Sequence, residues 1–452
     1  MSTIVAISTA PGLGGIGIIR MSGDDCFNIL SKIFKPKSNS EIKGYTIKYG
    51  RIVENNEIID EVLVSYFVSP KSYTTENMCE INSHGGIVIM RKILDLCIKN
   101  GAILAEPGEF TKRAFLNGRI DLSQAEAVID VINSKTSKEA KASISQLEGN
   151  LSISIKEIRK DLISGLADIE ASIDYPEYDE VEITNQKILE TLNRNKIRLI
   201  ELENSFINGK ILREGIKTAI IGRPNSGKSS LLNMLLNEER AIVTDIEGTT
   251  RDSIEEFISI EGVPFKIIDT AGIRDTNDKV EMIGVEKAQK IANSSDLIIA
   301  IFDISRSLNN EDIKILEILK NKNAIVVINK IDLDKVCVDE SIIKKYCDKI
   351  VYMSIKNKKG AKDLFDSLKQ LVNNKEIESD GEVLITSQRH KTLISNAKIS
   401  LENAIESLNL GMPVDVISIH IKEILEQLGK ITGETVTDDV INEIFSKFCL
   451  GK

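Results

Sequence analysis

The sequence contains no tryptophan, three histidines, and six cysteines that lie far apart. No two cysteines form a Cys-x-x-Cys pair and the histidines are not at metal-ligand spacing, so we expect neither a disulfide framework nor a zinc site. The longest apolar runs, such as residues 297–302, fall far short of the roughly 20 residues of a membrane span and predict buried strands. Because the start carries no basic and apolar leader, we expect a reduced, cytoplasmic protein without membrane attachment.

An excess of basic residues is also missing, since the formal net charge is −10 at pH 7. A chain with this balance has no global basic surface for nucleic acid, so any RNA contact must be local or shared with a partner. Apolar residues make up 42% and charged residues 28%, which is the balance of a globular protein with substantial cores. The length of 452 residues suggests about three domains.

The period of the hydrophobic pattern divides the chain into three regions. Residues 1–118 predict a mixed α+β domain, because β-branched runs broken by Gly, Pro and Asn precede a helical pattern. Residues 119–212 and 378–452 have helical spacing and predict an all-helical domain. Residues 215–375 alternate strands with helices, which is typical of a Ras-like α/β domain with a mostly parallel sheet. In the first region we expect strands at 3–9, 15–21, 45–53 and 58–68 and a helix at 87–100.

In the helical region, one apolar stripe marks a long helix. It consists of Ile155, Ile158, Leu162, Leu166, Ile169 and Ile173. Pro176 ends this helix, since proline disfavours helix in the residue before it, and a second helix follows through residue 202. Another stripe starts at Ile394, and further helices are expected at 414–428 and from 438 to the end. We favour one helical domain with the α/β domain inserted at an exposed tip; two separate helical domains are the alternative.

A phosphate-binding loop stands at the start of the α/β region. Residues 222–230 read Gly-Arg-Pro-Asn-Ser-Gly-Lys-Ser-Ser, the GxxxxGK[ST] pattern between an apolar strand and a helix. The glycines let backbone N–H groups turn toward phosphates at a helix N-terminus, whose dipole favours anions. Lys228 can reach the β- and γ-phosphates, and the Ser229 hydroxyl can ligate Mg²⁺. The strand–loop–helix setting disfavours the alternative, a plain glycine-rich turn.

Three further motifs predict a guanine-nucleotide site. Residues 269–272 (Asp-Thr-Ala-Gly) match DxxG, in which the aspartate would hold the Mg²⁺ shell and the Gly272 N–H would sense the γ-phosphate. Residues 329–332 (Asn-Lys-Ile-Asp) match NKxD. The Asp332 carboxylate can accept the N1–H and 2-amino donors of guanine, which adenine lacks. Residues 354–356 (Ser-Ile-Lys) differ from the usual Ser-Ala-Lys by the isoleucine. We expect its larger side chain to crowd the loop beside the base.

The sequence lacks the usual hydrolytic glutamine, since Ile273 follows DxxG. The side-chain carbonyl of Asn225 and carbonyls of residues 244–252 can instead coordinate a monovalent cation that neutralises transition-state charge. Asn225 can equally be a plain polar loop residue, and Thr250 is the natural second hydroxyl for Mg²⁺. The predicted nucleotide-binding residues are Asn225, Ser226, Gly227, Lys228, Ser229, Ser230, Thr244, Asp245, Ile246, Glu247, Gly248, Thr249, Thr250, Asp269, Thr270, Ala271, Gly272, Asn329, Lys330, Asp332, Ser354 and Lys356.

Four segments carry a resemblance that covers the whole chain. Residues 248–252 (GTTRD) are similar to the switch of the TrmE–Era–EngA-like GTPases. Residues 4–23 (IVAISTAPGLGGIGIIRMSG) and 107–122 (PGEFTKRAFLNGRIDL) resemble segments of the tRNA uridine-5-carboxymethylaminomethyl modification GTPases, the MnmE or TrmE family. Residues 445–452 (FSKFCLGK) resemble that family's C-terminal CIGK signature, with Leu450 in place of isoleucine.

The resemblance implies a folate site and a homodimer. The N-terminal domain would bind a one-carbon donor, 5-formyltetrahydrofolate or methylenetetrahydrofolate. By motif position the folate-binding residues would be Arg20, Glu80, Arg119 and Lys452. Cys449 would be catalytic near the transferred carbon; without the resemblance it would be an ordinary thiol. Many relatives have lysine in place of Arg119, which keeps the charge but changes the donor geometry.

The resemblance also implies the remaining GTPase residues and the reaction. The ligands of K⁺ would be Asn225, Thr244, Ile246 and Thr249. Glu281 would be the catalytic glutamate. The reaction would add a carboxymethylaminomethyl group to C5 of the wobble uridine of certain tRNAs, in a heterotetramer with the FAD-dependent MnmG protein.

Two other classes of GTPase are alternatives. An Era-like regulatory or ribosome-assembly switch would append an RNA-binding module, but this chain has no KH-type GxxG loop in a basic setting. A dynamin-like mechanical GTPase would need basic amphipathic or lipid-anchor segments, which the sequence does not contain.

Overall fold

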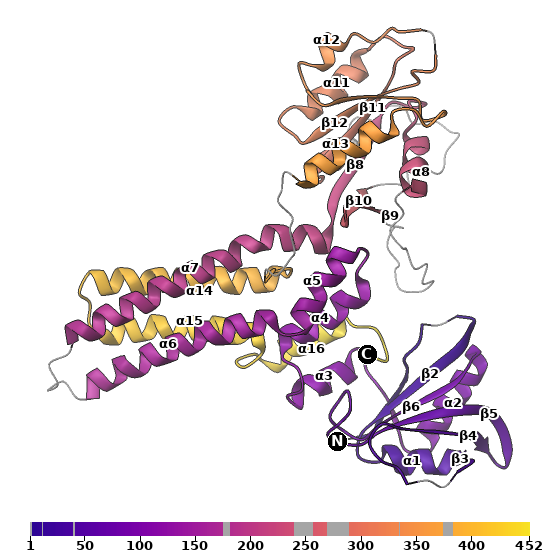
Figure 1. Cartoon of the computed structure of the whole chain (residues 1–452), viewed down its shortest axis with the longest axis vertical. Helices are drawn as coiled ribbons and strands as arrows, with labels where there is room; N and C mark the ends of the chain where they lie inside the picture. The colour runs from indigo at the N-terminus through magenta and orange to yellow at the C-terminus, as the bar shows by residue number, and fades with distance from the viewer. Residues whose placement is uncertain are drawn as a thin grey trace. The chain divides into compact units, whose positions relative to one another are not determined.

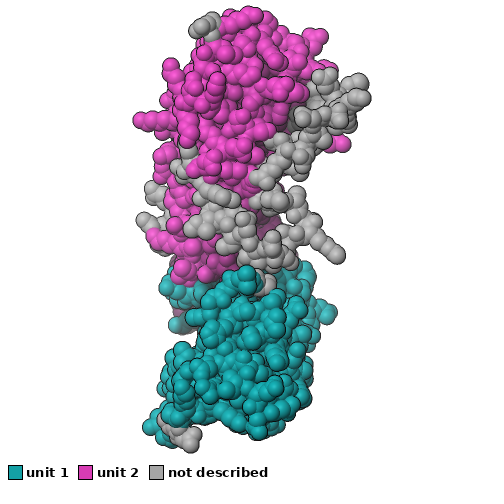
Figure 2. All heavy atoms as spheres, turned by 90° about the vertical axis from the view of Figure 1, so that its right-hand side faces the viewer, with its two compact units in different colours: residues 1–129, 147–167, 418–452 teal, residues 130–146, 168–417 magenta. Residues whose placement is uncertain are grey.

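The computed structural model describes residues 2–10, 12–38, 41–174, 181–238, 256–268, 289–333, 335–373 and 383–452. The chain forms two compact units (Figure 2): unit 1 comprises residues 1–129, 147–167 and 418–452, and unit 2 comprises residues 130–146 and 168–417. Figure 1 labels their helices and strands. The predicted fold class is confirmed, because an α+β part, long helices and an α/β part with a mostly parallel sheet are all present. The three domain boundaries stay a prediction.

Unit 1 contains a seven-stranded sheet, sheet A, in the order β3-β4-β5-β6-β2-β1-β7. All its neighbouring strands are antiparallel except β1 and β7. The strands are β1 (Ile4–Ile7), β2 (Gly14–Ser22), β3 (Phe34–Pro36), β4 (Thr46–Glu54), β5 (Glu57–Phe67), β6 (Met78–Gly85) and β7 (Ile103–Leu104). The expected strands and the helix α2 (Ile87–Lys99) are confirmed, whereas β6 was not predicted because its polar residues have low strand propensity.

The two faces of sheet A differ because side chains alternate along each strand. One face packs against α1 (Cys26–Ile33) and α2 in a single apolar core that includes Ile19, Val64 and Ile81. The opposite face carries Arg20, and Phe110 of α3 (Glu109–Leu116) covers it beside β1. On β4 and β5 this second face leaves Ile47, Tyr49 and Leu63 exposed.

The long helices agree with the predicted apolar stripes. They are α4 (Leu122–Asn133), α5 (Ser137–Leu147), α6 (Asn150–Asp174), α7 (Val181–Glu214), α14 (Gln388–Asn409), α15 (Val414–Thr432) and α16 (Asp438–Ser446). Ile155, Ile158, Leu162 and Ile169 of α6 are buried. Two predicted ends are wrong: α7 continues beyond residue 202, since Leu212 is buried in the core of sheet B, and α16 stops before the end of the chain. In the described part of the chain, no helix is long and apolar enough to cross a membrane.

Unit 2 contains a six-stranded sheet, sheet B, in the order β13-β12-β11-β8-β10-β9. Only β9 is antiparallel to its neighbour. The strands are β8 (Ile216–Gly222), β9 (Glu256–Ile260), β10 (Val263–Ile268), β11 (Leu297–Asp303), β12 (Ala324–Asn329) and β13 (Ile350–Met353). The helices are α8 (Lys228–Glu238), α11 (Asn310–Leu319), α12 (Glu340–Ile343) and α13 (Ala361–Asn373). Each face has its own apolar core, one with α8 and α13 and the other with α11, as expected for a doubly wound sheet.

The chain enters and leaves the α/β part near one end of α7. Gly215, at φ +78°, ends α7 and leads directly into β8. After α13, the Ile385 N–H donates to the Ser205 hydroxyl of α7 over 3.1 Å, and α14 then packs along α7 (Figure 1). Neighbouring entry and exit points are what an inserted domain requires.

Gly209 marks the close contact at this junction. A Cβ placed on Gly209 would lie 2.2 Å from the Ile385 carbonyl oxygen, so Gly209→Ala must displace backbone. We expect a loss of stability of about 1–3 kcal/mol, seen as a lower midpoint of thermal unfolding. The control is Gly165→Ala in α6, where a Cβ meets nothing within 4 Å. That variant should gain roughly 0.5–1 kcal/mol, and equal effects of the two substitutions would contradict the close contact.

Candidate functional site

The nucleotide motifs meet at one edge of sheet B because the strands that carry them are parallel. The loop of residues 222–228 follows β8, the NKxD motif starts at the last residue of β12, and Ser354 follows β13. Parallel strands place their carboxyl ends together, which is where open α/β sheets bind ligands. Sheet B therefore brings together segments that lie more than a hundred residues apart in the sequence.

The loop after β8 has the backbone conformation of a phosphate cradle. Asn225 is left-handed at φ +63° and Gly227 has φ +110°, so successive N–H groups turn toward the start of α8. A Cβ on Gly227 would lie 2.4 Å from Nδ2 of the Asn329 side chain, which makes glycine necessary there. The Lys228 amine donates to the carbonyls of Gly222 and Arg223 at 2.8 and 2.9 Å. Burial lowers the pKa of Lys228, since it disfavours the charged form, and a bound phosphate would oppose that shift.

The base side is held to the phosphate side by Asn329. Its amide donates to the Ser226 carbonyl over 2.9 Å, and its side-chain oxygen accepts the N–H of Ile355 over 3.2 Å. The Ser354 hydroxyl donates to Asp332 over 2.6 Å, and this hydrogen bond lowers the pKa of the Asp332 carboxyl. Asp332 is therefore kept ionised and oriented, as recognition of guanine donors requires.

A cavity of about 820 Å³ lies over this edge. Its lining includes the predicted residues Asn225, Gly227, Lys228, Ser229, Ser230, Asn329, Lys330, Asp332 and Lys356. Ser226 and Ser354 are buried just behind it. Ile355 lines the cavity but is 8% exposed and packs in the core with Leu231, so its bulk is accommodated mainly by the core.

The remaining predicted GTPase residues lie outside the described residues. They are Thr244, Asp245, Ile246, Glu247, Gly248, Thr249, Thr250, Arg251, Asp252, Asp269, Thr270, Ala271, Gly272, Ile273 and Glu281. Their roles stay predictions.

The four residues predicted for folate meet in unit 1. Arg20 and Glu80 are directly opposite on β2 and β6, and their side chains form an ion pair with contacts of 2.8 and 2.9 Å. Arg20 also donates to the Gly451 carbonyl over 3.2 Å, which brings the C-terminal segment to the sheet. The guanidinium carbon of Arg119 lies 4.4 Å from the centre of the Tyr73 ring, and that of Arg20 lies 5.6 Å from the same ring.

The segment Cys449–Lys452 is held through its main chain. The Gly451 carbonyl accepts from the Ser8 hydroxyl over 3.0 Å, and a Cβ on Gly451 would lie 2.4 Å from the Ile7 carbonyl oxygen. The Lys452 oxygen accepts the N–H of Phe110 over 3.2 Å, at the start of α3. Cys449 is exposed.

Sequence reasoning missed two residues at these sites. Asp303, the last residue of β11, pairs with Lys330 of NKxD over 2.6 Å. It could have been found, because it follows an apolar run on another parallel strand. Tyr73 gives no such signal, since its position beside Arg20 and Arg119 depends on how the loop before β6 folds.

Comparisons with known proteins show the family of the chain. A family model described as the MnmE helical domain matches residues 122–449, and one described as the GTP-binding protein TrmE N-terminus matches residues 3–119. The chain belongs to the MnmE family of tRNA modification GTPases. A tRNA modification GTPase MnmE of Acetivibrio thermocellus is 52% identical over 456 residues, covering 100% of this chain and 99% of the relative. The MnmE proteins of Clostridioides difficile and Finegoldia magna are 50% and 49% identical, and the matches cover 100% and 99% of this chain and 99% of each relative.

Membership in the MnmE family confirms the resemblance of the sequence motifs, and the alignments reach both ends of the chain. The family supports binding of GTP, and the cavity at the edge of sheet B stays its predicted site. The family match does not by itself assign the residues around Arg20, which stay predictions.

The contact between Ser354 and Asp332 generates a test of base recognition. Asp332→Asn should weaken GTP binding roughly 10- to 100-fold and strengthen binding of xanthosine triphosphate, because an amide can donate to the 2-carbonyl of xanthine. Ser354→Ala is the matched control, since it removes the hydrogen bond that orients Asp332 but keeps the carboxylate. It should weaken GTP without changing the preferred base. Unchanged nucleotide preference of Asp332→Asn in titrations would contradict the assignment.

Proposed function

We propose that the protein is a potassium-activated GTPase that modifies the wobble uridine of certain tRNAs. It would add a carboxymethylaminomethyl group to C5, using a tetrahydrofolate one-carbon donor and an FAD-dependent MnmG partner in the cytoplasm. The observation that supports this most strongly is the meeting of the C-terminal segment with Arg20 and Glu80, in a chain whose full length matches the MnmE family. A GTPase switch alone has no need of that second site.

In the GTPase half, described residues bind and orient the nucleotide. Lys228 would leave the carbonyls of Gly222 and Arg223 for the β- and γ-phosphates, and Asp332 would accept the guanine donors. Ser229 lines the cavity at the start of α8 and, with Thr250, would hold Mg²⁺. Bound Mg²⁺ would neutralise negative charge on the phosphates.

Asn225 fits a role in holding K⁺. Its left-handed backbone places the residue on the lining of the phosphate cavity, where an amide oxygen is a suitable ligand for a monovalent cation. Thr244, Ile246 and Thr249 would complete the site, and Glu281 would position or deprotonate the attacking water. Bound K⁺ would supply positive charge near the β–γ bridge, in the place of an arginine finger.

The residues around Arg20 fit a folate. A pterin presents N–H donors to a carboxylate such as Glu80, and its glutamate tail presents carboxylates to a guanidinium. Arg119 is exposed, and no carboxylate among the described residues pairs with it, so it suits an anionic ligand. Cys449 would lie near the transferred carbon, and Lys452 would add a positive charge.

The open face of sheet A suits a homodimer. Ile47, Tyr49 and Leu63 are exposed on the face that also carries Arg20 and Glu80. A second copy of the chain would cover these apolar side chains beside the folate site, as the burial of apolar surface favours. MnmG would then bind to form the heterotetramer. It would supply part of the tRNA contact, which agrees with the net charge of −10.

Mass spectrometry of wobble nucleosides tests the function as a whole. Deleting the gene should remove the carboxymethylaminomethyl group from the affected tRNAs, and the wild-type gene on a plasmid should restore it. An unchanged nucleoside profile in the deletion strain would show that the protein does not perform this modification.

The potassium mechanism has its own test in Asn225. Asn225→Ala and Asn225→Gly should both abolish stimulation of GTP hydrolysis by potassium, because both lack the amide oxygen. Binding of GTP should change little, least in Asn225→Gly, because glycine tolerates the left-handed backbone. Wild-type protein that hydrolyses GTP equally fast in sodium and potassium would contradict the mechanism.

Changes in the C-terminal segment should impair tRNA modification and leave GTP hydrolysis intact. Cys449→Ser and deletion of Lys452, singly and together, should leave GTP hydrolysis intact, since the nucleotide cavity contains neither residue. The double variant should bind 5-formyltetrahydrofolate more weakly in calorimetry and fail to restore modification in the deletion strain. Lys447→Ala is the control, because this exposed residue contacts only Glu443 among the ion pairs of the described chain. Normal modification by the double variant would show that Cys449 is an ordinary thiol.

A further inference from the structure

The Tyr73 ring touches both arginines of the site in unit 1. Arg119 lies 4.4 Å and Arg20 lies 5.6 Å from the ring centre, both within the distance of a cation–π contact. The Tyr73 hydroxyl is 2.9 Å from the Thr111 hydroxyl of α3, which fixes the ring at its far end. Tyr73 is half-buried and packs beside Phe110, so the ring has a defined orientation before any ligand arrives.

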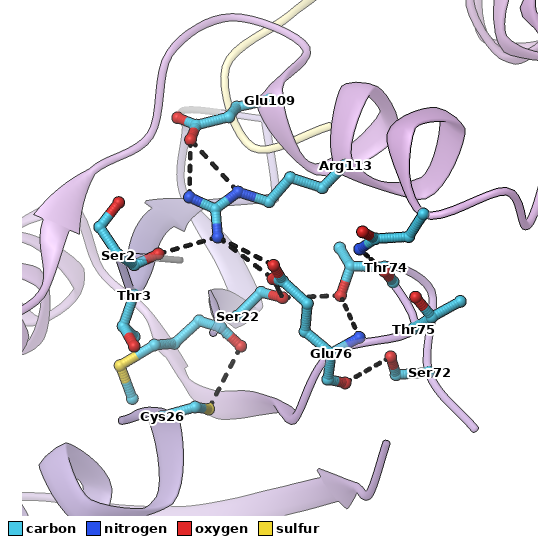
Figure 3. A network of polar contacts seen from close by, with 12 residues as sticks. Ser2, Thr3, Ser22, Cys26, Ser72, Thr74, Thr75, Glu76, Glu109 and Arg113 are labelled. Carbon is cyan, nitrogen blue, oxygen red and sulfur yellow. Dashed lines mark hydrogen bonds and ion pairs between the residues drawn. The ribbon is translucent and has the colours of Figure 1, made fainter. Parts of the chain in front are cut away.

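The loop that carries Tyr73 is fixed by a buried polar network, which Figure 3 shows. Arg113 of α3 is almost fully buried and forms ion pairs with Glu76 at 3.2 Å and Glu109 at 2.9 Å. Glu76 accepts a hydrogen bond of 2.7 Å from the Ser22 hydroxyl of β2. Thr74 is fully buried, and its hydroxyl lies 2.7 Å from that of Ser22. These contacts hold the residues on both sides of Tyr73 against α3 and sheet A.

The two arginines differ in how much they depend on this ring. Arg20 is also held by the carboxylate of Glu80 and the carbonyl of Gly451. Arg119 is exposed, and among the described residues its side chain contacts only the Tyr73 ring. A free arginine side chain samples many rotamers, and stacking on an aromatic face selects few of them. Removing the ring should therefore release Arg119 and leave Arg20 nearly in place.

We propose that Tyr73 is a positioning residue of the folate site: its ring holds the Arg119 guanidinium toward the carboxylates of the ligand. This inference rests on the folate role proposed above. The role proposed for Tyr73 uses the ring and not the hydroxyl, which lies 2.9 Å from that of Thr111.

Calorimetry with 5-formyltetrahydrofolate on the full-length protein tests the proposal. Tyr73→Leu, which keeps apolar volume but lacks the ring, should weaken binding roughly 3- to 30-fold, the range of a cation–π contact. Tyr73→Phe keeps the ring and should bind within about threefold of wild type. A Tyr73→Phe variant as weak as Tyr73→Leu would overturn the proposal, because it would assign the effect to the hydroxyl.

A double-mutant cycle separates positioning from a structural role. Arg119→Gln should weaken binding roughly 10- to 100-fold, as expected for loss of a charge-assisted contact. If Tyr73 acts through Arg119, Tyr73→Leu should cost less than about twofold in the Arg119→Gln background. If Tyr73 only supports the fold, the two losses should multiply, and that result would overturn the proposal.

Different results would contradict the folate role of the site and the positioning role of Tyr73. Absence of folate binding by wild-type protein would overturn both, whereas wild-type binding with multiplied losses would overturn only the role of Tyr73. If Tyr73→Leu does not fold, the wild-type ring can report instead. Protein labelled with 3-fluorotyrosine gives a fluorine resonance for Tyr73, which the spectrum of Tyr73→Phe assigns. Arg119→Gln should shift this resonance, and 5-formyltetrahydrofolate should shift it in the wild-type protein. No shift in either case would overturn the proposal.

Discussion

The parallel pairing of β8, β11, β12 and β13 places the carboxyl ends of these strands at one edge, and the nucleotide site depends on that edge. The phosphate loop, the base motif and Ser354 reach the cavity because their strands end there. Asn329 then connects the two sides, with one hydrogen bond to each loop. Asn329 therefore fixes the phosphate loop relative to the loop after β13.

The site in unit 1 is built on antiparallel strands instead. It combines β2, β6, the loop before β6 and the last residues of the chain. The Gly451 carbonyl accepts hydrogen bonds from the side chains of Ser8 and Arg20, and Phe448 packs in an apolar cluster with Tyr73. Gly451 permits this approach, because any Cβ there would meet the Ile7 carbonyl. Arg20 is common to most of these contacts, since it touches Glu80, Gly451, Phe110 and Tyr73.

Much of the fold could be predicted, and the errors have physical causes. The periodic helices were found because an apolar stripe is a local pattern, as in α6 and α14. The end of α7 was missed, since burial of Leu212 against sheet B extends the helix past the point where its own pattern weakens. Strand β6 was missed because Glu80 and Asn82 have low strand propensity and favour the sheet only through their pairing with β2 and β5.

The sequence by itself predicted the chemistry of the nucleotide site, because each motif is a short segment whose residues act within a few positions of one another. It also identified the family, through segments at both ends of the chain. Only the tertiary structure decided that Tyr73 stands beside both Arg20 and Arg119, and that Ile355 packs into the core. The physical reason is that such contacts join residues far apart in the chain. Strand register and loop packing set the distances between these residues, and no local sequence pattern predicts either.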